Sequence, residues 1–132
     1  MEINIWVVLG IIVIHWFADF VLQTDEMAQG KSKNWSDLLN HTMTYSLIWY
    51  VIGTILIVVN LNWPFFDYPS WALTKFVVIT FIAHTATDYY TSRVNSMLWE
   101  KKEVHNFFVS IGFDQVLHYI QLFLTYQLLI NY

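Results

Sequence analysis

The chain has 132 residues, of which 57% are hydrophobic, 19% are aromatic and only 12% are charged. Soluble domains carry about a quarter charged residues, so this composition favours a lipid environment. The absence of cysteine excludes disulfides and thiolate metal ligands. The net charge of −4 and the lack of a basic patch argue against nucleic acid as a partner.

Four apolar stretches follow one another along the chain, each near the roughly 20 residues that cross about 30 Å of hydrocarbon. They predict transmembrane helices over residues of about 3–23, 37–60, 71–92 and 104–130. Little sequence is left for a soluble domain. We therefore predict an all-α fold in which residues 1–132 form a single transmembrane domain, an integral membrane four-helix bundle.

The connections between these stretches, at residues 24–37, 60–70 and 93–103, are short and differ in charge. Five of the six basic residues lie on the first and third connections: Lys31, Lys33, Arg93, Lys101 and Lys102. By the positive-inside rule these two connections face the cytoplasm and both termini lie outside it. We expect the membrane to be a bacterial inner membrane, with the lipid bilayer as the main partner.

The first and third predicted helices contain similar segments, IVIHWFADF and FIAHTATDYY, each with a histidine and an aspartate four residues apart. Both helices would run in the same direction across the membrane. The similarity therefore predicts a parallel duplication of two helix pairs, related by an axis along the membrane normal.

Each predicted helix carries one polar stripe on an otherwise apolar surface. Residues at i and i+4 share a helix face, and the stripes hold three His/Asp pairs of this spacing: His15 and Asp19, His84 and Asp88, and Asp114 and His118. Polar side chains have no partners in lipid, so we expect the stripes to converge inside the bundle. Each such ionisable residue costs on the order of 2.5–3.5 kcal/mol at a helix centre, which folding alone does not require.

Imidazole and carboxylate groups are the usual ligands of Zn, Mn and Fe, and helix bundles build one- or two-metal sites from them. We therefore predict one or two divalent metals per chain. The predicted metal ligands are His15, Asp19, His84, Asp88, Asp114 and His118.

The remaining polar residues near this level suggest catalytic and substrate-binding roles. His41 would be an added ligand or a general base, and we expect His41 and Asp114 to take part in catalysis. Lys31, Arg93 and Gln23 would bind the substrate, because two of them are cations that can hold a negative charge.

Three segments, HWFADFVLQTDEMAQGKS, HTATDYYTSR and HNFFVSIGFDQVLHY, resemble a family of small bacterial and phage membrane proteins of uncharacterised function. The positions that carry the resemblance are His15, Asp19, Gln23, Asp25, Lys31, Ser32, His41, His84, Asp88, Arg93, His105, Asn106, Asp114, Gln115 and His118. The layout is also similar, more distantly, to membrane-bound metal-dependent hydrolases. That second resemblance implies metal-dependent hydrolysis without indicating a substrate.

These observations favour a membrane-embedded, metal-dependent hydrolase that acts on an anionic, phosphoester-like substrate in the membrane or its cytoplasmic leaflet. A proton or divalent-ion transporter or channel would use the same residues as a relay. A phage or host membrane interaction protein would need them only as a structural polar network. The sequence leaves open the substrate, the metal, a homo-oligomer, and whether the protein is an enzyme.

Overall fold

In the computed structural model, which describes residues 4–59 and 70–130, the chain is built from helices and short turns. The elements are α1 (Ile5–Trp16), the π-helical turn η1 (Phe17–Val21), α2 (Asp25–Gly30), α3 (Trp35–Val58), α4 (Ser70–Glu100) and α5 (Val104–Ile130). These residues contain no strand, so the all-α prediction is confirmed for them. The expected outer connection at 60–70 lies outside the described residues except for its last position, which begins α4.

The prediction of four helices was wrong, because the described residues form five α-helices. The additional helix, α2, lies within the segment expected to be a connection. Thr24 caps it, with the side-chain oxygen accepting a hydrogen bond from the backbone N–H of Met27 at 3.2 Å. Asp25 and Glu26 then fill its first turn, where negative charge is favourable. Six residues are too few to produce an apolar repeat that hydropathy could detect.

Helix α4 extends to Glu100, well beyond its predicted end near residue 92. Residues 93–100 contain neither glycine nor proline, so nothing in this segment stops the helix. It ends where Lys102 adopts a left-handed conformation with φ of 59°, and the N–H of Glu103 bonds back to the carbonyl of Leu98 at 3.0 Å. The third connection is therefore a tight turn of residues 101–103.

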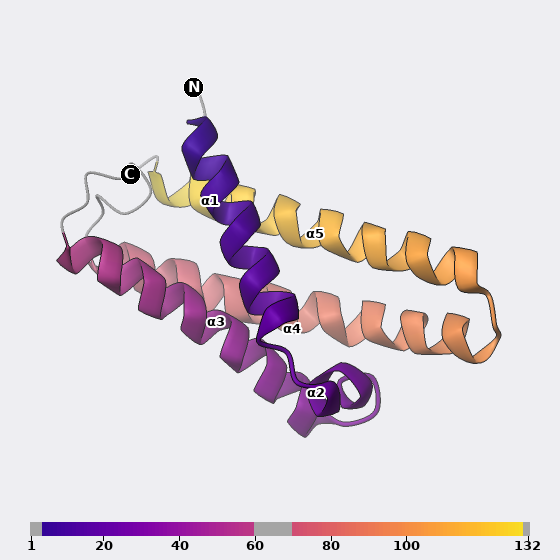
Figure 1. Cartoon of the computed structure of the whole chain (residues 1–132). Helices are drawn as coiled ribbons and strands as arrows, with labels where there is room; N and C mark the ends of the chain where they lie inside the picture. The colour runs from indigo at the N-terminus through magenta and orange to yellow at the C-terminus, as the bar shows by residue number, and fades with distance from the viewer. Residues whose placement is uncertain (1–3, 60–69, 131–132) are drawn as a thin grey trace.

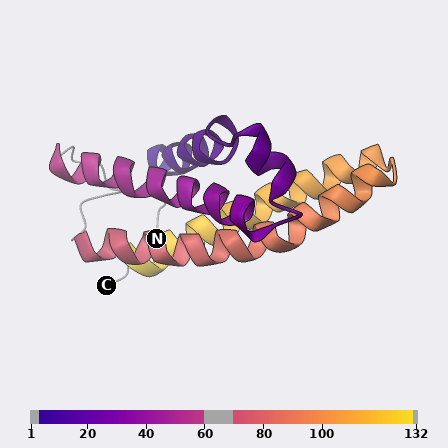
Figure 2. The same cartoon turned by 90° about the horizontal axis from the view of Figure 1, so that it is seen from below.

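Helices α3, α4 and α5 run roughly along one direction, whereas α1 crosses them obliquely (Figure 1). The main packed pairs are α4 with α5, α3 with α4, and α2 with α3, and η1 packs against α3. Figure 2 shows that the α4–α5 hairpin extends beyond the other helices on the side of its turn. This projection follows from the length of α4, about 46 Å for its 31 residues.

One end of the interior is an apolar cluster to which all four long helical segments contribute. Its members are Val7, Ile11, Ala18, Tyr45, Trp49, Leu73, Phe76, Leu122 and Tyr126. One or two turns further along each helix the buried residues become polar, with His15 on α1, His84 on α4 and His118 on α5 all fully buried. The interior is therefore layered, with an apolar end and a polar middle.

The outward faces of the helices are rich in exposed apolar side chains, from Ile5 to Val21, Met43 to Val59, Val78 to Ile82 and Phe108 to Leu128. Among the described residues, Trp35–Val58 and Val104–Leu128 are long and apolar enough to cross a membrane. A shorter apolar helix covers Ile5–Val21. The fold thus places polar residues inside and apolar residues on much of its surface.

Candidate metal centre

Asp19 enters the centre from a distorted turn of helix. The backbone N–H of Leu22 bonds to the carbonyl of Phe17 at 3.1 Å, five residues back, and residues Phe17–Val21 form the π-helical turn η1. Such turns occur frequently at functional sites because they rotate the side chains that follow them. Asp19 is 4% exposed and lies 3.7 Å from His15, measured from Oδ2 to Nε2.

The first ligand group consists of Asp19, His41, His84 and Asp88, all buried. His41 Nε2 lies 3.1 Å from Asp19 Oδ1, 3.1 Å from Asp88 Oδ2 and 3.2 Å from His84 Nε2. His84 Nε2 lies 3.4 Å from Asp19 Oδ1 and 3.7 Å from Asp88 Oδ2. One donor atom of each residue therefore faces a common point.

These spacings match a four-coordinate metal site. Bonds of about 2.0–2.1 Å in a tetrahedron separate the ligand atoms by about 3.3 Å, close to the measured 3.1–3.7 Å. Among the described residues Asp19 Oδ1 accepts no hydrogen bond of good geometry, despite its two histidine neighbours. This arrangement is expected at a metal site, where the lone pairs of the two imidazole nitrogens and of the carboxylate oxygen all point at the cation and not at one another.

The second ligand group consists of Asp88, Asp114 and His118. His118 Nε2 lies 3.0 Å from Asp88 Oδ1 and 3.4 Å from Asp114 Oδ1. Asp88 belongs to both groups, with Oδ2 facing the first and Oδ1 facing the second. A carboxylate in this position can bridge two cations, so the two groups together contain six different residues that could hold one or two metal ions.

His15, a predicted ligand, lies in neither group. Its Nε2 lies 2.8 Å from Gln115 Oε1, which can only accept, so this nitrogen carries the proton. Its Nδ1 then accepts a hydrogen bond from the Tyr45 hydroxyl at 2.8 Å. Both nitrogens are engaged, and His15 supports the centre from outside.

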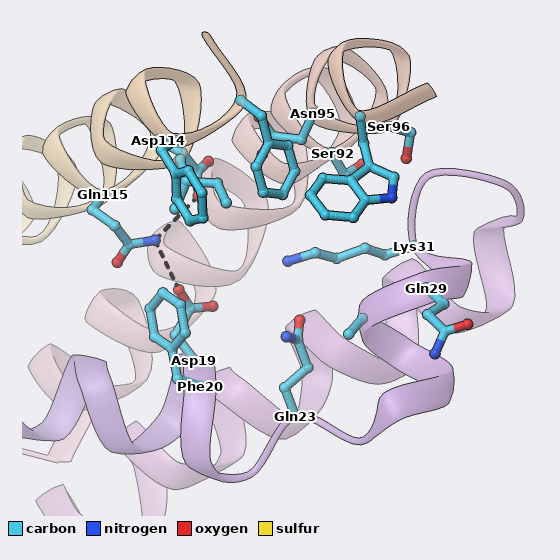
Figure 3. Close-up of a pocket in the computed structure, with 15 residues that line it drawn as sticks. Asp19, Phe20, Gln23, Gln29, Lys31, Ser92, Asn95, Ser96, Asp114 and Gln115 are labelled. Atoms are coloured by element: carbon cyan, nitrogen blue, oxygen red, sulfur yellow. Dashed lines mark hydrogen bonds between the residues drawn. The ribbon is translucent and has the colours of Figure 1, made fainter. Parts of the chain in front are cut away.

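Gln115 connects this support to the carboxylates. Its Nε2 donates to Asp19 Oδ2 at 3.3 Å and to Asp114 Oδ2 at 3.1 Å (Figure 3). The Oδ1 atom of each aspartate is thereby directed towards the histidines. The sequence analysis named Gln115 among the positions that carry the family resemblance but predicted no role for it in the site, although it follows Asp114 directly in the chain. The sequence signal for such a role was an amide side chain directly next to an acidic candidate ligand.

The imidazole rings of the centre are held by stacking. The ring of His84 lies between Tyr45, at 3.9 Å between centroids, and His118, at 4.2 Å. Within the described residues, Nδ1 of His84 and Nδ1 of His118 have no hydrogen-bond partner. Ring contacts, rather than the outer hydrogen bonds usual for histidine ligands, therefore fix their orientation.

Lys31, at the C-terminal end of α2, adds a positive charge to the centre. Its Nζ lies 2.9 Å from Asp88 Oδ2, and the side chain is 18% exposed. Burial acts to lower the pKa of the Lys31 amine, but the Asp88 and Asp19 carboxylates outweigh burial and raise it above the ordinary value. Lys31 is therefore a fixed ammonium ion beside the candidate ligands.

A pocket of about 480 Å³ opens next to the centre and is lined by residues of η1, α2, α4 and α5. Asp19, Asp114 and Gln115 form its inner wall. Lys31 extends across it, and Gln23 and Asn95 face it from opposite sides (Figure 3). The structure thus brings two of the predicted substrate-binding residues, Lys31 and Gln23, to one cavity.

Arg93, the third predicted substrate-binding residue, is not among the residues that line this pocket. Its guanidinium donates to the carbonyl of Tyr89 at 2.6 Å and lies over the Tyr89 ring at 3.7 Å. Trp35 stacks on the same tyrosine at 5.0 Å. Arg93 therefore lies with Tyr89 and Trp35, outside the pocket that contains Lys31.

No curated protein and no solved structure matches the chain. A family model described as "Protein of unknown function (DUF3307)" matches residues 7–132, a range that contains every residue of both ligand groups. Because this match covers nearly the whole chain, the protein belongs to that family.

Proposed function

We propose that the protein is a membrane-embedded, metal-dependent hydrolase that binds two divalent cations and acts on a phosphoester. The observation that carries the proposal is the pair of buried ligand groups that share Asp88. Dinuclear carboxylate–histidine sites of this kind are built inside helix bundles, and paired metals serve hydrolytic enzymes.

The membrane setting is supported by the surface. Exposed apolar side chains cover the outward faces of α1, α3 and α5, and contiguous apolar surface of this extent is unusual on a soluble monomer. The chain would cross the bilayer four times, through α1 with η1, α3, α4 and α5. Helix α4 carries Lys75, Asp88 and Arg93, and these charged residues make it less apolar than α3 and α5.

The net charge of the centre supports an order of binding in which the metal ions bind before the substrate. Asp19, Asp88 and Asp114 together with Lys31 leave two negative charges when the histidines are neutral. A phosphoester would be repelled by that charge. Two divalent cations would reverse it to two positive charges, and they would also supply Lewis acidity and an activated water.

The protein side chains have distinct roles in this proposal. His41 is a ligand rather than the general base, because its Nε2 faces the first group. Asp114 is a ligand of the second group. Lys31 holds the phosphoryl oxygens, and Gln115 with His15 keeps two carboxylates in position.

A transporter is the main alternative, and the layering of the interior argues against it. A transport path would continue from the centre to the opposite side of the membrane. In that direction the interior is occupied by Ile11, Trp49, Phe76 and Leu122, which are buried and apolar. A cavity closed on one side suits an enzyme better than a pore.

Metal analysis and turnover test the proposal together. Protein purified in detergent should contain about two equivalents of Zn, Mn or Fe, as paired bundle sites do. It should hydrolyse p-nitrophenyl phosphate, lose that activity with a chelator and regain it with added metal. Folded protein without bound metal or turnover would refute the hydrolase, and metal flux across vesicles without turnover would favour the transporter.

A further inference from the structure

The pocket beside the centre has two chemically different ends. Its inner end is polar and is formed by the acidic residues, Gln115, Lys31 and Gln23. Its less buried lining is mainly apolar, with Phe20, Trp99, Phe107, Phe108 and Ile111, and also contains Gln29 and Ser96. A small, fully hydrated phosphoester would use only the inner end.

The polar end contains hydrogen-bonding groups that the described residues leave unused. Ser92 Oγ, Asn95 Oδ1 and Gln23 Oε1 are buried and have no partner within the part of the chain that the structure describes. Ser92 is only 6% exposed and lines the pocket. Buried polar atoms without partners are costly, so these groups indicate a polar ligand at this end.

The apolar end reaches the outer surface of the bundle. Phe20 is 44% exposed, Trp99 59% and Phe108 63%, although all three line the pocket. Phe20 comes from η1, which packs on α3, and Phe108 comes from α5, which packs on α4. The exposed part of the lining therefore has η1 and α2 on one side and α4 and α5 on the other.

The opening lies near the level of the lipid headgroups in the proposed membrane setting. Asp19 is only six residues before the exposed Asp25 at the start of α2. The helix Ile5–Val21 spans about 25 Å, barely enough for the hydrocarbon core, so its C-terminal end must lie close to the surface. Charged headgroups and the candidate metal ligands would thus be at similar depth.

We infer that the substrate is a membrane amphiphile, with a phosphoester headgroup on one apolar chain or more, that enters laterally between η1 and α5. The headgroup binds beside Lys31 and the metal ligands, with Ser92, Asn95 and Gln23 as hydrogen-bonding partners. The chain lies against Phe20, Phe108 and Ile111 and continues into the bilayer. This inference rests on the proposed function and specifies its substrate class.

Photolabelling tests the site independently of turnover. The full chain is reconstituted in phosphatidylcholine vesicles with Mn²⁺ or Zn²⁺ and a long-chain alkyl phosphate that carries a diazirine on its chain. We expect labelling to concentrate at Phe20 and residues 107–111. A probe with the same chain and a trimethylammonium headgroup should label the lipid-facing surface without this preference, because the loaded centre repels cations.

A matched pair of variants locates the chain. Ile111→Trp fills the apolar end and should reduce labelling by the alkyl phosphate at least about fivefold, since overpacking a filled space costs about 1–3 kcal/mol. Ile120→Trp makes the same exchange on the same helix outside the pocket and should leave labelling unchanged. Ile120→Trp should also hydrolyse p-nitrophenyl phosphate as the unmodified protein does.

The outcomes separate the two proposals. Labelling spread evenly over the helices, or unaffected by Ile111→Trp, would overturn the lateral site. If such a protein still hydrolysed p-nitrophenyl phosphate with metal, the hydrolase would stand without its lipid substrate. Concentrated labelling in a protein with no turnover on either phosphoester would keep the amphiphile site and reject the hydrolase.

Discussion

Asp88 contacts more side chains of the centre than a carboxylate that binds one metal ion would need to contact. Its Oδ2 meets His41 and the Lys31 ammonium, and its Oδ1 meets His118. The carboxylate is almost completely buried. A buried carboxylate needs compensating positive charge, and Lys31 alone serves three aspartates. The charge that is still missing is what two cations would provide.

Replacing Asp88 with Asn should therefore remove both metals. The amide keeps the shape of the side chain but cannot bridge two cations, so we expect affinity to fall by more than about a hundredfold, beyond the roughly 10–100-fold cost of outer-shell changes. Elemental analysis of the purified variant measures this. Asp25→Asn removes a carboxylate from the exposed start of α2 and should leave metal content unchanged. Equal metal in both variants would contradict a bridging role.

His15 and His41 should respond differently to substitution. His41→Ala removes a donor from the first group and should eliminate one equivalent of metal. His15→Ala removes hydrogen bonds to Gln115 and Tyr45 but no member of either ligand group, so the full metal content should remain at saturation, with affinity weakened about 10–100-fold. Metal titration of the two variants separates these effects. Loss of a metal equivalent in His15→Ala would restore the sequence prediction.

The i, i+4 spacing was sufficient to predict that the three His/Asp pairs lie inside, but not which histidines belong to the groups that could hold a metal. His15 and Asp19 have the same spacing as His84 and Asp88. The pairs differ because Asp19 lies in the π-helical turn, whereas His84 and Asp88 lie on regular helix. Helix rotation and the position of α3 then bring His41, rather than His15, to the centre. The helix rotation and the position of α3 depend on tertiary packing, which the spacing of residues along one helix does not encode.

Among the elements, α2 depends on one close contact. A Cβ on Gly30 would overlap the Asp37 carboxylate and come within 2.9 Å of Asp37 Cβ, so rotation of that side chain could not relieve the overlap. Gly30 immediately precedes Lys31. The packing of α2 on α3 therefore sets the position of the ammonium ion at the centre.

Gly30→Ala should separate α2 from α3 and destabilise the protein by about 1–3 kcal/mol, the usual cost of overpacking. It should also weaken phosphoester binding, because Lys31 would move with α2. Gly112→Ala is the control, since nothing lies within 4 Å of its added Cβ, and a helical Gly→Ala exchange is neutral or stabilising by about 0.5–1 kcal/mol. Thermal unfolding in detergent compares the two. Identical midpoints would show that the α2–α3 contact is unimportant.

At the scale of elements, hydropathy predicted the long apolar segments and missed what lies at their ends. It placed α2 in a connection and stopped α4 near residue 92, because the segments involved are polar. The sequence does contain a signal for the start of α2, because Thr24 is a residue type that favours the N-cap position of a helix. The extension of α4 matters for the site, since Asn95, Ser96 and Trp99 line the pocket from that part of the helix.

For the whole molecule, neither the oblique crossing of α1 nor the lateral opening could be predicted from the sequence. Both depend on how η1 packs on α3 while α5 packs on α4. The layered interior was partly predictable, because the buried histidines and aspartates give way to apolar residues such as Leu73 and Leu122, although Thr125 continues the polar stripe on α5. Apolar closure on one side and a pocket with polar and apolar lining on the other are the features on which the proposal of an enzyme, rather than a conduit, rests.

The orientation of the molecule in the membrane decides which leaflet supplies the substrate. The four crossings that we propose would put both termini on one side, and the turn at residues 101–103 and the segment around Lys31 on the other, with five of the six basic residues. We therefore expect a C-terminal alkaline phosphatase fusion to be active and a C-terminal green fluorescent protein fusion to be dark. The same reporters inserted at Lys102 should give the reverse result. A fluorescent C-terminal fusion would place the pocket at the outer surface, and the substrate would then have to come from the outer leaflet.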